Sequence, residues 1–261
     1  MKQISKSLLA IFLVLILTSP KMFSQSVDQM IDEVDEYYKQ FNNEKALDVL
    51  KKAEKAEPNN FEVIWRMSRT LVDIAEKMPT STSQQEDAQI ATYQKALEYA
   101  DKAVKTNSSS SLGFLRRAIA NGKIALFKGV FSVAGVVNSV RADVEKAIAL
   151  NTGGNFIQGV AHYVLARTHA KTSDKWKPAR AVLGLGWADN EIAITEYKKA
   201  IQLYPNYVMF YVDYANSLIR EDDYKTAREM LNKALKTPIA HQDDEKRLAE
   251  AKKTLNDIKD E

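Results

Sequence analysis

Hydrophobic residues along most of this chain recur at spacings of three, four and seven positions, which is the periodicity of amphipathic helices. One part of this pattern repeats: a small or aliphatic residue is followed seven positions later by an alanine. The five pairs are Ala46 and Ala53, Ala96 and Ala103, Val140 and Ala147, Ala193 and Ala200, and Ala227 and Ala234. Small residues on one stripe of a helix let a neighbouring helix approach closely, so each pair predicts a tightly packed helix.

Each alanine-bearing segment follows another amphipathic segment, so the chain is predicted to consist of helix pairs. The pairs are expected at 27–60, from 61, from 111, from 155 and at 208–237, and a charged terminal helix is expected at 243–258. Tandem helix pairs with a unit near 34 residues are typical of tetratricopeptide repeats, and a polar last helix suits the end of a solenoid. The predicted fold is all-α: a tetratricopeptide-like α-α superhelix of about five helix pairs with inserts and a C-terminal capping helix.

The second alanines of the five pairs are unevenly spaced. Successive distances are 50, 44, 53 and 34 residues, so the three middle units carry about 16, 10 and 19 extra residues. All three inserts fall between the two helices of a unit, which places them on one rim of the solenoid. Residues 130–140 of the second insert are apolar and β-branched, and their helical flanks favour a helix there over a strand.

The third insert, residues 171–187, carries Trp176, Arg180 and Trp187. Tryptophan side chains beside basic residues suit contact with a membrane surface or with a partner protein. They also suit a segment that folds back over the helical core. The sequence leaves both interpretations open.

The N-terminus has the pattern of a targeting segment. Lys2 and Lys6 precede an apolar run at 8–17, and a small, polar stretch follows it. This pattern predicts a secretory signal peptide at 1–25, cleaved near 24–26, and a mature repeat domain at 26–261 that is exported, periplasmic or secreted. The apolar run is shorter than the roughly 20 residues that span a bilayer. The alternative is an uncleaved N-terminal segment that anchors the protein at a membrane.

Charge and composition narrow the function classes. Removing residues 1–25 lowers the formal charge from +3 to zero, because that segment contains Lys2, Lys6 and Lys21 and no acid, so no nucleic-acid partner is expected. The absence of cysteine excludes disulfides and thiolate metal sites. His162 and His169 lie seven positions apart without a third ligand, so no metal site is predicted. No catalytic constellation or cofactor motif stands out, and the chain is not expected to be an enzyme.

One polar pattern follows the concave face of the predicted solenoid. It consists of Lys39, Lys123, Arg167 and Arg220 at corresponding positions of four first helices, with Arg69 and Asn216 one turn earlier. The second repeat is the exception, because it carries Asp73 there. Such a ladder suits the carboxylates of an acidic peptide or of a peptide C-terminus. The alternative is that these cations only complement the negative ends of their helices.

Several short strings, in this order and at these distances, resemble the regulator of microtubule dynamics family. They are WRMSR at 65–69, ALEYADKA at 96–103, VEKAIALN at 144–151 and YKKA at 197–200, together with Trp176 and the basic segment after it. The similarity covers roughly residues 30–258. It implies an all-helical, divergent tetratricopeptide-like interaction protein, associated with microtubules in some members and anchored at organelle membranes in others.

The expected function is a non-catalytic scaffold that binds a protein or peptide partner in a concave groove. A membrane-surface adaptor, held by the N-terminal segment and the 171–187 insert, is the alternative from another class. A cytoskeletal role is a third interpretation, which the predicted export segment opposes, since an exported protein does not meet tubulin.

Overall fold

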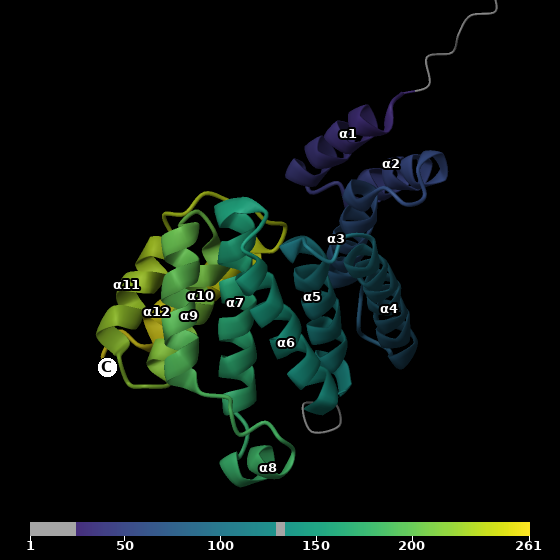
Figure 1. Ribbon diagram of the computed structural model, residues 1–261. Coiled ribbons are helices and arrows are strands. Elements are labelled where there is room, and N and C mark those ends of the chain that lie inside the picture. The colour runs from purple at the N-terminus through teal and green to yellow at the C-terminus, as the bar shows by residue number, and fades with distance from the viewer. Residues whose placement is uncertain (1–24, 129–133) are drawn as a thin grey trace, which may run out of the picture.

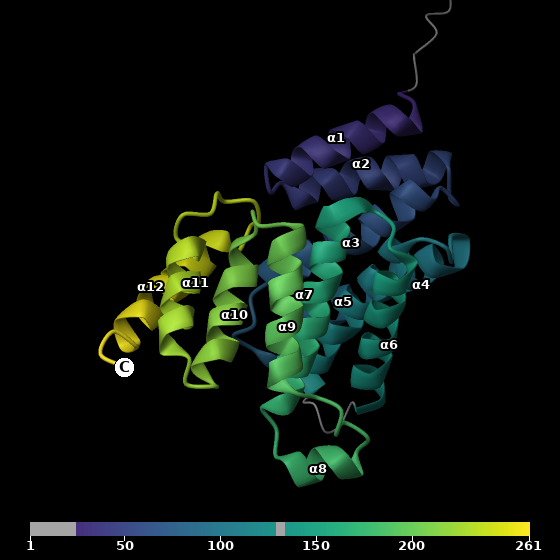
Figure 2. The same ribbon diagram turned by 60° about the vertical axis from the view of Figure 1, so that its left-hand side comes forward.

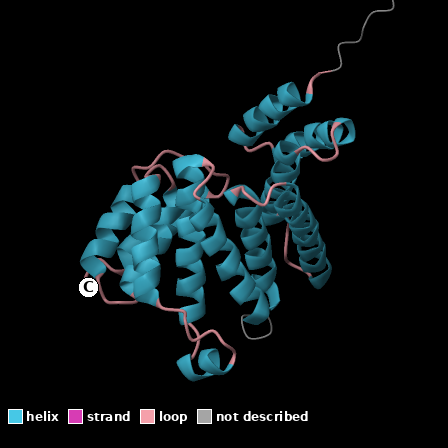
Figure 3. Ribbon diagram, in the orientation of Figure 1, coloured by secondary structure: helices cyan, strands magenta, loops and turns pink. Residues whose placement is uncertain are grey.

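The computed structural model describes residues 25–128 and 134–261, and these residues form twelve helices and no strand (Figures 1 and 3). The helices are α1 (Val27–Lys39), α2 (Asn43–Ala56), α3 (Phe61–Lys77), α4 (Ser83–Thr106), α5 (Ser111–Lys128), α6 (Ala134–Leu150), α7 (Gly154–Ser173), α8 (Lys177–Val182), α9 (Asn190–Leu203), α10 (Val208–Ile219), α11 (Tyr224–Ala234) and α12 (Asp244–Asp257). None of the helices in this part of the chain combines the length and apolar character needed to cross a bilayer.

The helices pack as five pairs in chain order, followed by a terminal helix. The pairs are α1 with α2, α3 with α4, α5 with α6, α7 with α9, and α10 with α11, while α12 packs on α10 and α11. The first helices also contact one another, from α1 to α3, α5, α7 and α10. They therefore form one continuous inner layer, and the second helices form the outer layer (Figures 1 and 2). The predicted fold of five helix pairs and a capping helix is confirmed.

The alanine pattern forms the contact between layers. Its nine alanines are fully buried: Ala46, Ala53, Ala96, Ala103, Ala147, Ala193, Ala200, Ala227 and Ala234. The larger residue three positions before the second alanine is buried as well, as Tyr197 and Leu231 illustrate. Because the packed interior has no spare volume at these alanines, a larger side chain there would push two helices apart.

The inserts mostly lengthen helices instead of forming long loops. Helix α4 has 24 residues and α7 has 20, against 11 in α11 of the regular last pair. The extra residues are good helix formers that continue the 3.6-residue period. Helix α4 begins at Ser83 and is capped by Thr82, whose side chain accepts a hydrogen bond from the Gln85 backbone N–H at 3.3 Å. Of the predicted helix at 130–140, residues from Ala134 belong to α6 and the rest lie outside the described residues.

The third insert forms α8 and the turns around it, on the rim between α7 and α9 (Figure 1). Trp187 folds back: its indole N–H donates to Asn138 at 2.8 Å and its ring stacks edge-on against His169. Arg180 is also buried and donates to the backbone carbonyl of Ala188 at 2.6 Å. Trp176, in contrast, is 72% exposed.

The connection between α11 and α12 crosses the inner layer toward the N-terminal repeats, as the yellow loop in Figure 1 shows. Gln242 in this connection donates to the backbone carbonyl of Asp73 at 2.8 Å and accepts from the side chain of Asn43 at 2.9 Å. The first two repeats and the last one therefore meet over the concave face. This contact encloses the site described next.

Candidate functional site

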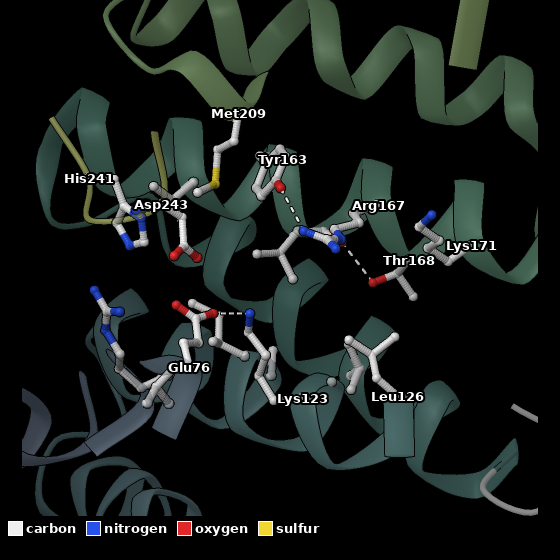
Figure 4. A pocket seen from close by; sticks show the side chains of 18 of the residues that line it. Glu76, Lys123, Leu126, Tyr163, Arg167, Thr168, Lys171, Met209, His241 and Asp243 are labelled. Atoms are coloured by element: carbon white, nitrogen blue, oxygen red, sulfur yellow. Dashed lines mark hydrogen bonds and ion pairs between the residues drawn. The ribbon is translucent and has the colours of Figure 1, made fainter. Parts of the chain in front are cut away.

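A cavity of about 210 Å³ lies on the concave face, between the inner helices and the α11–α12 connection (Figure 4). Its apolar walls include Val137, Val140, Val160, Val164, Ile119 and Leu126. Its charged residues are Asp73, Glu76, Arg116, Lys123, Arg167, Lys171, His241, Asp243 and Arg247. Gly122 of α5 also lines it, and a Cβ atom added there would meet nothing within 4 Å. The cavity is thus an apolar space with charged groups of both signs around it.

One side of the cavity carries a closed polar network. The Tyr163 hydroxyl donates to Asp213 at 2.6 Å, and Arg167 donates to the Tyr163 oxygen at 2.9 Å. Arg167 and Arg247 also lie 3.4 Å and 3.7 Å from the Asp213 carboxylate. Burial raises the pKa of Tyr163, so its hydroxyl stays protonated and can donate. These residues fix α7, α10 and α12 relative to one another.

The opposite side holds three side chains from distant parts of the sequence. Asp73, Glu76 and His241 each bring one ligand-type atom within 4.8 Å of the others, a spacing that suits a cation. The Asp243 backbone N–H donates to His241 Nδ1 at 3.3 Å, which assigns the ring proton to Nε2, the nitrogen that faces Asp73 at 4.0 Å. Lys123 pairs with Glu76. The three side chains therefore resemble a polar network more than a set of free metal ligands.

Within that network the two acids differ. Burial raises the pKa of Glu76, but Lys123 and His241 outweigh this effect, and the pKa ends below its usual value. Burial also raises the pKa of Asp73, and its neighbours compensate only partly, so the pKa reaches about 6. Among the described residues, no donor hydrogen-bonds to the Asp73 carboxylate; His241 Nε2 lies 4.0 Å from it, and Arg69 and Arg116 act on it from farther away.

Arg116 of α5 is a second residue of the cavity that has a hydrogen-bonding atom without a partner. Its Nε atom is buried and has no hydrogen-bond partner, and no described carboxylate lies within 4.0 Å of its guanidinium. Its contact with an aromatic ring is distant, 5.7 Å to the centre of Trp65. Arg69, one repeat earlier, is in contrast paired with Asp35 at 3.1 Å and lies 3.7 Å over the ring of Tyr38.

A second cavity of about 670 Å³ adjoins the first, since Tyr38, Phe156 and Tyr207 line both. Its wall includes Lys39 and Arg69, together with the acidic face of α1. The basic ladder predicted from the sequence is thereby split. Lys123 and Arg167 line the first cavity, Lys39 and Arg69 line the second, and Asn216 and Arg220 line neither.

Each residue of the ladder has an intramolecular partner. Lys39 pairs with Glu36, Arg69 with Asp35, Lys123 with Glu76, Arg167 with Asp213, and Arg220 with Asp174, while Asn216 donates to Glu250. The ladder therefore contributes to the stability of the concave face, and its binding role stays a prediction.

The two histidines considered together in the sequence have separate partners. His162 contacts Glu196 at 2.5 Å, and His169 accepts from the Asp189 backbone N–H at 3.3 Å.

The sequence did not identify Arg116 or His241 as site residues. Arg116 stands next to Arg117 in an ordinary basic dipeptide, and only the fold shows that one of them points inward. His241 lies in a connection whose path across the groove has no local sequence pattern. Asp73 did give a clue, because it breaks the basic ladder at one position.

The model of a known protein family, Regulator of microtubule dynamics protein 1-3, matches residues 30–259. The chain belongs to the regulator of microtubule dynamics family. It is 28% identical to Regulator of microtubule dynamics protein 1 of Bos taurus over 138 residues, which are 53% of this chain and 41% of the relative. The corresponding protein of Mus musculus is 28% identical over 125 residues, 48% of this chain and 39% of the relative. The alignments thus span about two fifths of these relatives.

Solved structures agree with the family's helical-repeat fold. A thermophilic TPR protein of Thermus thermophilus, TTC0263, superposes with a TM-score of 0.61 at 16% identity, over 87% of this chain and 98% of its own. PilF of Pseudomonas aeruginosa superposes with a TM-score of 0.50 at 13% identity, over 89% of this chain and 91% of its own. At these identities the similarity establishes the tetratricopeptide-like fold alone.

Proposed function

We propose that this protein is a non-catalytic scaffold that binds a segment of a protein partner in the cavity on its concave face. The observation that carries the proposal is a partly open, mostly apolar cavity, lined by helices of several repeats and the α11–α12 connection, beside charged groups of both signs. Concave, mostly apolar cavities with a few polar groups are the usual form of binding sites. Tetratricopeptide-like solenoids bind partners on this face.

The α11–α12 connection partly covers the groove, which favours binding of an extended segment of the partner over binding of a large folded surface. The α11–α12 connection reaches Asp73 and Asn43 and narrows access to the cavity. A single chain in extended conformation can enter such a space, and the adjoining larger cavity offers room for its continuation.

Filling the cavity tests the proposal. Gly122→Leu adds a side chain at the cavity lining, where a Cβ atom meets nothing within 4 Å, so we expect it to occupy the cavity. Gly135→Leu is the matched control, because Gly135 is helical, exposed, equally unobstructed and not part of the cavity lining. A photo-cross-linking amino acid at Leu126, which lines the cavity, would be used in each background.

The same partner should cross-link in the wild-type and Gly135→Leu backgrounds and be lost in Gly122→Leu. Circular dichroism and thermal melting would verify that all three proteins are folded. Undiminished cross-linking of that partner in Gly122→Leu would refute binding in the cavity.

A second candidate function, adaptor at a membrane surface, has one observation in its favour. Trp176 and Val182 on either end of α8 are 72% and 87% exposed, whereas Trp187 and Arg180 are engaged inside the protein. Co-sedimentation with anionic vesicles, compared between wild type and Trp176→Ala, tests it. The predicted signal peptide and the alternative N-terminal anchor lie almost entirely outside the described residues, and both, like cleavage near 24–26, stay predictions. So does a role at microtubules, which the name of the family suggests.

A further inference from the structure

Arg116 is a permanent positive charge at the cavity; no described carboxylate lies within 4.0 Å of it, and Asp73 acts on it only from farther away. Arginine does not lose its proton in proteins, so the protein cannot remove the charge by titration. The Arg116 Nε atom is buried without a hydrogen-bond partner, and removing part of a charged group from water without a partner is unfavourable. The other nearby arginines differ from Arg116 in having a carboxylate partner: Asp35 accepts from both Arg66 and Arg69, at 2.6 Å and 3.1 Å. The Nε atom of Arg69 is nevertheless buried without a hydrogen-bond partner, like that of Arg116. The arrangement leaves one guanidinium available to an anion from outside.

Besides the Arg116 guanidinium, the cavity contains the Asp73 carboxylate, which accepts no hydrogen bond from a described donor. It is 7% exposed, it lines the same cavity, and no described donor reaches its carboxylate within hydrogen-bond distance. Lys123 does not serve it, because its ammonium pairs with Glu76. A ligand that fits the cavity must therefore offer both an anionic group and a hydrogen-bond donor.

We propose that the cavity holds the C-terminal residue of a partner peptide, with its carboxylate on Arg116, its amide N–H toward Asp73 and an apolar side chain against the valines of α6 and α7. The inference rests on the proposed function and names its ligand. A carboxylate accepts the guanidinium's paired N–H groups, and burial strengthens such a charge-assisted bond. Val137, Val140, Val160 and Val164 supply the apolar wall.

The size of the site favours a peptide terminus over a free fatty carboxylate. At about 210 Å³ the first cavity is below the roughly 300–1,000 Å³ of sites that enclose a whole ligand. It therefore suits the end of a longer molecule, whose preceding residues extend into the adjoining cavity of about 670 Å³. A fatty carboxylate also has no donor for Asp73.

The test uses the full chain and twenty pools of random hexapeptides, each pool fixed at its C-terminal residue. Every pool is made as the free acid and as the C-terminal amide, and retention on the immobilised protein is measured by mass spectrometry. Arg116→Met removes the proposed anion-binding group. Arg117→Met is the matched control on the same helix, because Arg117 pairs with Asp143 and Asp101 and does not line the cavity.

We expect free acids to be retained at least tenfold more than amides in pools that end in an aliphatic or aromatic residue. Arg116→Met should abolish this preference, while Arg117→Met should keep it. Thermal melting would show that Arg116→Met is folded at the assay temperature. Asp73→Asn should weaken retention of the same acids without removing their advantage over amides.

Two results would overturn the inference and separate it from the proposed function. Equal retention of acids and amides, with both lost in Gly122→Leu, would mean that the cavity binds peptides but not through a terminal carboxylate. Retention of no pool above the Gly122→Leu level, together with Arg116-dependent binding of decanoate, would mean that the cavity takes a fatty carboxylate and that peptide binding fails as well.

Discussion

Asp213 and Asp73 are two equally buried carboxylates on the inner layer, each 7% exposed, and their surroundings differ completely. Asp213 accepts a hydrogen bond from Tyr163 at 2.6 Å and lies near two arginines. Asp73 has only His241 at 4.0 Å. Burial alone therefore does not distinguish a structural acid from a functional one, and the presence of partners does.

The same contrast separates two parts of the concave face. Around Asp213 the polar groups satisfy one another and join α7, α10 and α12 into a rigid unit. Asp73 and Arg116 both line the first cavity, and their charges act on each other without an ion-pair contact. A fully satisfied network stabilises the fold, whereas an unsatisfied one costs stability and is retained where a ligand completes it.

The largest expected effect is that of Asp213→Ala. Removing this carboxylate leaves Arg167 and Arg247 near each other without their shared acid. Breaking a buried ion pair in this way costs about 3–5 kcal/mol. Urea denaturation at pH 7.5 would measure the loss. A loss below about 1 kcal/mol would mean that the polar network around Asp213 does not stabilise the fold and would contradict its contrast with Asp73.

Asp73→Asn should increase the free energy of unfolding, in contrast to Asp213→Ala. The pKa of Asp73 is about 6 in the folded chain, above its ordinary value of 3.8, so the folded state holds the proton more tightly than the unfolded state. The contribution of this acid to stability therefore falls as the pH rises from about 4 to about 6, by up to about 3 kcal/mol. The variant should be about 1–3 kcal/mol more stable than wild type at pH 7.5.

The gain from Asp73→Asn should become small near pH 4 and vanish at lower pH, as the wild-type carboxyl becomes protonated in both states. Urea midpoints for both proteins at several pH values would show this convergence. A variant that is less stable than wild type at pH 7.5 would mean that Asp73 has stabilising partners after all.

Two glycines of α5 extend the comparison to packing. A Cβ at Gly122 meets nothing within 4 Å, whereas a Cβ at Gly113 lies 3.0 Å from the Val104 backbone nitrogen of α4. Gly122→Ala should raise the free energy of unfolding by about 0.5–1 kcal/mol, because alanine is the better helix former. Gly113→Ala should lower it, since the two helices must separate. If both variants gained stability, α4 and α5 would not be in close contact.

The smallest effect is expected on the rim. Trp176→Ala should change stability by less than about 0.5 kcal/mol, as is usual for exposed positions, because the side chain is 72% exposed. Trp187→Ala, its matched counterpart, should be clearly destabilising because that ring contacts His169 and Asn138. Equal losses in thermal melting would contradict the different placement of the two rings.

The sequence predicted those parts of the fold that depend on local periodicity. The alanine stripes, the helix pairs and the final helix follow from spacings within single helices. The sequence did not predict whether the inserts form loops or helices. The spacing of the alanines was equally compatible with a rim loop, but in α4 the insert continues a helix of 24 residues. Most of the site could not be predicted from the sequence, because Asp73, Arg116 and His241 come together only through packing of distant elements.

The central claim, that the Arg116 side of the cavity is left open for a ligand, is tested most directly by urea denaturation of Arg116→Met beside Arg117→Met. Arg116→Met should be as stable as wild type or more stable, because it removes an unpaired charge. Arg117→Met should lose about 1–3 kcal/mol, because the buried Asp143 carboxylate loses its hydrogen-bond partner. A comparable loss in Arg116→Met would show that Arg116 is structural and would contradict the account.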